Sequence, residues 1–170
     1  MFIRITEEQG YMRRFVVCLL LLVIFFIFPL HVFVIGDEIG IGIQGAVYRY
    51  QVTGYGNSLI PITQEIMYIA EGIYSGKTAL SIILWASGTV LLTITTWYGL
   101  VYNDCSNPDF NKKVSIGITG SCVCYLMSCI AQYGLLFHGP AGVSFPAGIG
   151  IILVWLGFLR FFPQKWFSSP

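Results

Sequence analysis

The sequence predicts an all-α membrane protein: a bundle of four transmembrane helices with a small external α/β cap between the first two. Three observations support this fold class. The 170-residue chain is 56% hydrophobic and 10% charged, whereas a water-soluble domain carries about 25% charged residues. Its apolar residues gather in four long runs that contain no Asp, Glu, Lys or Arg. The longest polar segment, residues 37–78, separates the first two runs.

The four apolar runs are each expected to cross the bilayer. About 20 residues with a rise of 1.5 Å each cross a hydrocarbon core of about 30 Å. Three runs reach that length, and the Gly-rich fourth is extended by Arg160, which can snorkel to the interface. The predicted spans are residues 15–36, 79–102, 114–137 and 142–162.

Lys and Arg are distributed unequally between the two sides of this bundle. Seven of the nine basic residues fall on the side of the N-terminus, and only Arg49 and Lys77 fall on the other. Because loops rich in Lys and Arg stay in the cytoplasm, both termini are expected there, in the plasma membrane of a prokaryote. The cytoplasmic segments would be residues 1–14, 103–113 and 163–170, with residues 37–78 and the turn 138–141 outside.

The external segment 37–78 is expected to begin with a β-hairpin. Residues 39–44 and 47–53 alternate with period two, and Gly45-Ala46 between them suits a tight turn. An amphipathic helix is expected to follow Pro61 and to end before Gly76, because isoleucines recur there at helical spacing. The predicted core of the cap is Ile62, Ile66, Ile69 and Ile73.

Two short strings resemble binding motifs without meeting their requirements. Residues 72–78 resemble a phosphate-binding loop but have three residues between the glycines instead of four. Residues 52–57 resemble a potassium-channel filter, but Val and Thr are exchanged and a strand-like segment precedes them. A helix end and a turn at Gly54-Tyr55-Gly56 explain both strings. Nucleotide is therefore excluded as a partner, and the net charge of +1 excludes nucleic acid.

Two histidines, His31 and His138, are the candidate cofactor ligands, since facing helical histidines can hold a haem. Their predicted depths in the membrane differ and no carboxylate is adjacent, so an interfacial histidine and a turn histidine are the alternative interpretation. No catalytic residue, metal site or cofactor is predicted.

Small residues recur at three- and four-residue spacing in the predicted spans, which lets helix backbones approach closely in lipid. These stripes either close the bundle of one chain or contact a partner. The predicted helix-packing residues are Gly117, Ser121, Cys124 and Ser128 in the third span, Gly88 and Thr95 in the second, and Gly150 and Gly157 in the fourth.

The leading functional hypothesis is a non-catalytic membrane protein that forms homo-oligomers or joins other membrane subunits, with the lipid bilayer as its surroundings. The predicted spans carry no charge, which argues against an ion pump. The sequence also shows no nucleophile–base pair that would indicate an enzyme. The alternatives are a passive pore or transporter for an uncharged or weakly selected solute, and a haem- or metal-binding redox subunit. The outline is similar to that of claudins, but the Trp…Gly-Leu-Trp…Cys…Cys signature of that family is missing, as is the Cys-Cys-Gly of tetraspanins.

Overall fold

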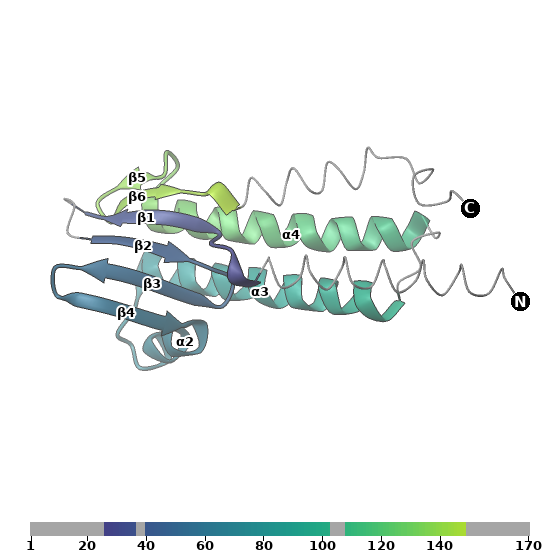
Figure 1. Ribbon diagram of the computed structural model, residues 1–170, viewed down its shortest axis with the longest axis horizontal. Coiled ribbons are helices and arrows are strands. Elements are labelled where there is room, and N and C mark those ends of the chain that lie inside the picture. Colours follow the sequence, from purple (N-terminus) through teal and green to yellow (C-terminus); the bar gives the residue numbers. More distant parts are fainter. Residues whose placement is uncertain (1–25, 37–39, 103–107, 149–170) are drawn as a thin grey trace, which may run out of the picture.

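The computed structural model describes residues 26–36, 40–102 and 108–148. These residues form a six-stranded antiparallel sheet and three helices (Figure 1). The fold is therefore α/β, and the predicted all-α four-helix bundle was wrong. The strands are β1 (His31–Ile35), β2 (Gly40–Gln44), β3 (Tyr48–Thr53), β4 (Gly56–Pro61), β5 (His138–Gly139) and β6 (Gly142–Phe145). The helices are α2 (Ile62–Ala70), α3 (Gly76–Tyr102) and α4 (Pro108–Tyr133).

The sheet joins two distant parts of the chain. Its strand order is β4-β3-β2-β1-β6-β5, so the meander β1 to β4 is extended by strands that follow α4. In register, Val34 lies opposite both Ile41 of β2 and Val143 of β6. Gly142 has φ +124°, and a Cβ there would overlap the carbonyl oxygen of Val34, so only glycine permits this strand pair.

Strands β1 and β6 correct two of the predicted spans. Residues 31–35 end the expected first span, and residues 142–145 begin the expected fourth, yet both segments are strands. Both were mistaken for helix because they are only four or five residues long and continue into longer apolar runs, which hides the period of two. Residues 15–25 and 149–162 of these spans, with Gly150 and Gly157, lie outside the described residues.

The predicted hairpin is confirmed, and the predicted helix is shorter than expected. Strands β2 and β3 pair antiparallel around the buried turn Gly45-Ala46. The sequence did not predict β4, which adds a third strand to this hairpin. Helix α2 begins after Pro61, as expected, but ends at Ala70 and is followed by Gly72 with φ +75°.

Helices α3 and α4 pack along each other and bring the small residues of the two stripes together. A Cβ on Gly88 would contact Cys124, and one on Gly117 would overlap Thr95. Near the start of α3 and the end of α4, Ser81 Oγ donates to the Ser128 carbonyl at 2.9 Å, and Ser128 Oγ donates to the Ser81 carbonyl at 2.8 Å. The stripes on these two helices therefore close the chain's own helix pair. Ser121, on the same stripe, is fully buried.

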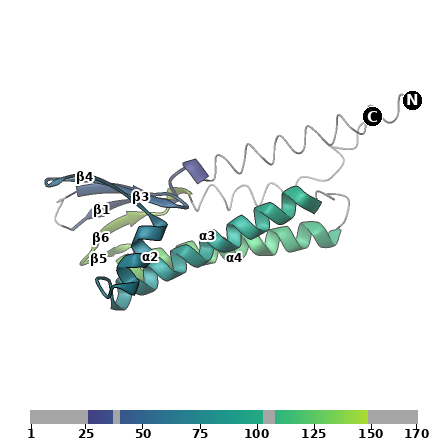
Figure 2. The ribbon, with the colours of Figure 1, turned by 90° about the horizontal axis from the view of Figure 1, so that it is seen from below.

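Two of the helices are long and apolar enough to cross a membrane: Gly76–Gly99 of α3, with 24 residues, and Lys112–Tyr133 of α4, with 22 residues. The sheet covers one side of this pair at the end where α3 begins and α4 finishes, and its strands run along the helices (Figures 1 and 2). The other half of each helix extends beyond the sheet.

We expect Gly117→Ala to destabilise the helix pair. The new methyl would displace Thr95, whose hydroxyl donates to the Leu91 carbonyl, and overpacking costs about 1–3 kcal/mol. Gly99→Ala is the matched control, because a Cβ there meets nothing within 4 Å and alanine favours a helix by up to about 1 kcal/mol. Unfolding by SDS titration in mixed micelles measures both; equal stability of the two variants would contradict this packing.

Candidate functional site

The two faces of the sheet differ in polarity, and the polar face is the one that packs on the helices, which is the reverse of the usual arrangement. An antiparallel sheet normally turns apolar residues to the core and polar residues to water. Here the inner face, which packs on α3 and α4, carries the polar residues, and the outer face carries apolar ones. Among the six described strands, Arg49 is the only residue of formal charge, and it points inward.

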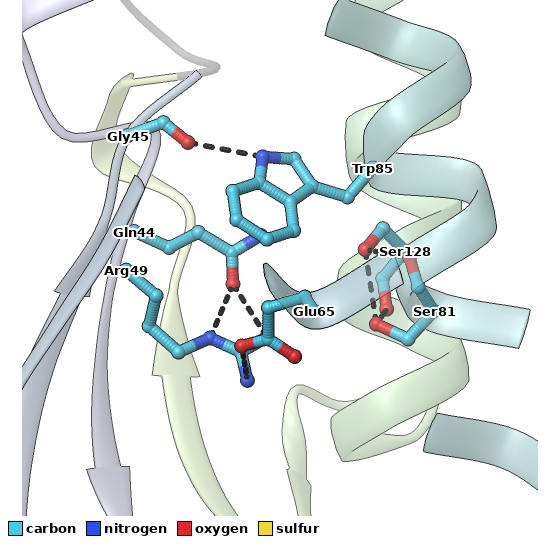
Figure 3. A network of polar contacts seen from close by, with 7 residues as sticks. All are labelled: Gln44, Gly45, Arg49, Glu65, Ser81, Trp85 and Ser128. Carbon is cyan, nitrogen blue, oxygen red and sulfur yellow. Dashed lines mark hydrogen bonds and ion pairs between the residues drawn. The ribbon is translucent and has the colours of Figure 1, made fainter. Parts of the chain in front are cut away.

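A chain of polar side chains crosses the inner face from β6 to α2, and Figure 3 shows its part from Gln44 through Arg49 to Glu65. Ser144 Oγ lies 3.0 Å from His31 Nδ1. His31 is opposite Gln44 in the strand register and also interacts with its side chain. Gln44 Oε1 accepts hydrogen bonds from Arg49 Nε at 3.2 Å and Nη2 at 2.9 Å. Arg49 Nη1 then forms an ion pair with Glu65 Oε1 at 2.9 Å.

The Arg49 guanidinium is enclosed by aromatic rings as well as by polar partners. Its central carbon lies 5.7 Å from the Trp85 ring centroid and 5.8 Å from that of Phe33. Cations within about 6 Å of a ring face are attracted by its quadrupole. The charge is thus held by two rings, an amide and a carboxylate.

Helix α3 holds the β2–β3 turn through its own side chains. The Trp85 indole N–H donates to the Gly45 carbonyl at 3.0 Å, and Thr89 Oγ1 donates to the Ala46 carbonyl at 2.6 Å. Thr89 Oγ1 is also 3.2 Å from the Tyr125 hydroxyl of α4. Since these carbonyls are buried, their pairing satisfies backbone groups that would otherwise be costly.

Glu65 is the polar residue of α2 that the sequence did not identify. It is fully buried, and its ion pair with Arg49 lacks hydrogen-bond geometry, so neither carboxylate oxygen accepts a hydrogen bond from the described residues. Burial raises the pKa of Glu65, and the charge of Arg49 opposes that shift. Burial also raises the pKa of the nearby Tyr74, and the charge of Glu65 adds to this.

His31 is held neutral by its surroundings. Burial, with a smaller contribution from the charge of Arg49, lowers the pKa of His31 from 6.5 to about 4. A neutral imidazole accepts or donates one hydrogen bond at each nitrogen, which suits its place between Ser144 and Gln44. His31 is therefore part of the inner polar chain.

The structure does not bring the two candidate ligands together. His31 lies buried on the inner face in β1, whereas His138 is exposed in β5 and lies opposite Val143 on the outer face. Among the described residues, no group of three His, Cys, Asp or Glu side chains could hold a metal ion. The haem and metal interpretations thus lose the geometry on which they depended.

The predicted core of the cap is only partly in place. Ile62 and Ile69 pack against the core, but Ile66 and Ile73 are 46% and 60% exposed. Helix α2 is rotated so that Glu65, which lies on the Ile69 side of the helical wheel, faces inward, and Ile73 lies beyond the end of the helix. The signal in the sequence was the pair Arg49 and Glu65, which have opposite charges and are the only charged residues between Glu38 and Glu71.

The outer face of the sheet is almost wholly apolar. Cross-strand register places its residues side by side, with Ile41 opposite both Val34 and Val52. Ile41, Leu59 and Phe145 are each more than half exposed. We define the outer face as Val32, Val34, Ile41, Ile43, Tyr50, Val52, Leu59, Val143 and Phe145, with Asn57 and His138 as its polar members.

Comparison with known families, with characterised proteins and with solved structures finds no match for this chain.

Arg49→Met is expected to destabilise the protein by about 3–5 kcal/mol, because it leaves the buried Glu65 without its counter-charge. The double variant Arg49→Met/Glu65→Met removes both charges and should be less destabilised than Arg49→Met alone. SDS titration of the single and double variants measures this. Additive losses in the double variant would show that the two charges do not interact.

The contribution of His31 to stability is expected to fall as the pH is lowered from 6.5 to 4. His31 is protonated below about pH 6.5 in the unfolded chain, but only below about pH 4 in the folded protein. At about 1.4 kcal/mol per pKa unit, this difference amounts to about 3 kcal/mol. His31→Gln should reduce the pH dependence by that amount, whereas His138→Gln, at an exposed site, should retain it. Identical pH profiles for wild type and His31→Gln would contradict the buried neutral histidine.

Proposed function

We propose that this protein is a non-catalytic integral membrane subunit that assembles with membrane proteins through the outer face of its sheet. The observation that supports the proposal is the absence of charge from that face, combined with the exposure of Ile41, Leu59 and Phe145. Large apolar patches on a protein surface mark sites of protein or membrane contact.

The helices α3 and α4 support the membrane part of the proposal. A core helix of a soluble protein is mostly buried, but only 39% of the most apolar window of α3 and 33% of that of α4 are buried. Most of their exposed side chains are large and apolar, as lipid contact requires. These apolar side chains are Leu80, Ile83, Val90, Ile94, Trp97 and Val101 on α3, and Ile116, Val123 and Met127 on α4.

We infer the orientation of the subunit from the exposed lysines of its helix pair, of which two lie at one end and one, Lys77, at the other. Lys112 and Lys113 lie near the start of α4, at the end of the helix pair that is remote from the sheet (Figure 1). We place that end in the cytoplasm, because cytoplasmic segments carry the excess of Lys and Arg. The end of the helix pair that carries the sheet is then directed to the external side.

The buried polar chain supports assembly by fixing the sheet on the helices. Hydrogen bonds from Trp85 and Thr89 to the β2–β3 turn, and the ion pair between Arg49 and Glu65, hold the inner face. A sheet that is held on one side presents its other side as a rigid surface. Rigid surfaces lose little conformational freedom when they bind.

Ile41→Lys is expected to release the protein from its membrane complex. A lysine at the centre of an apolar interface must be desolvated without a partner, which disfavours association. Blue native electrophoresis of solubilised membranes should show a smaller species than for wild type, with unchanged thermal unfolding. Ile73→Lys is the matched control, because Ile73 is 60% exposed and lies outside the outer face. Unchanged migration of Ile41→Lys would refute assembly through this face.

A further inference from the structure

We infer that the outer face binds a second copy of this chain, face to face, about a twofold axis perpendicular to the membrane. The inference rests on the proposed function and adds to it the identity of the partner. Three features of the outer face support it: its lack of charge, its direction relative to the helices, and its size.

The lack of charge makes the outer face complementary to itself. In a twofold interface the same patch occurs on both subunits, so every charge on the axis would meet its own copy. Like charges that meet across an interface cost several kcal/mol and exclude that pairing. The one charge in the described strands, Arg49, is directed to the inner face and neutralised by Glu65. Nothing in the strands on the outer face repels a second copy.

The direction of the outer face suits a neighbour in the same membrane. The strands run along α3 and α4, and the sheet lies as a layer beside the helix pair (Figures 1 and 2). If these helices cross the bilayer, the outer face is directed sideways, parallel to the membrane plane. All copies in one membrane share one orientation, so a twofold axis along the membrane normal brings this face against itself.

The size of the face is sufficient for sheet-on-sheet packing. Six strands are hydrogen-bonded in one sheet, and its outer residues are mostly β-branched or aromatic. Sheets of three or four strands already form the two layers of immunoglobulin-type sandwiches. Two such faces pack about 10 Å apart with their strands roughly 30° from parallel. Ile41 and Val34 are cross-strand neighbours on β2 and β1, the two middle strands of the sheet. Their side chains would lie within this interface.

Two differently tagged copies of the full chain, co-expressed and placed in lipid nanodiscs, test the inference. We expect wild type to show the mass of two chains and to co-purify through both tags. Ile41→Glu alone and Ile41→Lys alone should each weaken this association about tenfold or more, because like charges meet. Co-expression of Ile41→Glu with Ile41→Lys should restore it, which only contact between two copies explains. Ile73→Glu and Ile73→Lys are the controls and should behave as wild type.

Cross-linking gives a second measurement that does not depend on charge. With a short bis-maleimide in native membranes, Ile41→Cys should form a dimer above the wild-type background from the native cysteines, and Ile73→Cys should not. Suppose that wild type is a dimer, that the Ile41 charge variants do not weaken it, and that Ile41→Cys does not cross-link it. This result would overturn both the inference and the proposed use of this face. A single-chain mass for wild type would overturn the inference alone if Ile41→Lys still releases the chain from a complex with a different protein.

Discussion

The Arg49 guanidinium lies where β1, β2, β3, α2 and α3 meet. Its neighbours are Phe33, Gln44, Glu65 and Trp85, one from each of the other elements. A buried cation is tolerated only where charge and hydrogen-bonding groups surround it. This requirement fixes the position of α2, because Glu65 must reach the cation. It also explains why the inner face is polar, since the partners of Arg49 must occupy the strands beside it.

The distribution of polarity follows from that arrangement. Once polar residues occupy the space between sheet and helices, the apolar residues at the intervening strand positions turn outward. Soluble sheets do the reverse, and transmembrane barrels share the pattern found here, with apolar residues outside and polar residues inside. The polar side chains of the sheet therefore contact other parts of the same chain, and its apolar side chains are the ones that are exposed. A partner of matching polarity is the simplest way to shield that surface from water.

The parts of the fold that depend on local sequence could be predicted. The β2–β3 hairpin has alternating strands and a tight turn within 15 residues of chain, and the start of α2 follows Pro61. The small residues that join α3 and α4 could be recognised from spacing, although not which surface they contact. The pairing of β1 with β6 could not be predicted from local sequence, because Phe33 and Ser144 lie in apolar runs that are typical of transmembrane helices. The burial of Glu65 could not be predicted either, since it depends on where β3 places Arg49 and on the rotation of α2.

The pairing of β1 with β6 has a consequence for the order of events during synthesis. His31 and Ser144 are 113 positions apart, so β1 emerges from the ribosome long before the strand that closes its second edge. At roughly 5–20 residues per second, the 113 residues take roughly 6–23 s, during which that edge stays open. Meanwhile its unpaired N–H and C=O groups offer a template to any extended chain nearby. Both α3 and α4 must be synthesised within this interval, so the sheet is completed only after the helices that support it have been made.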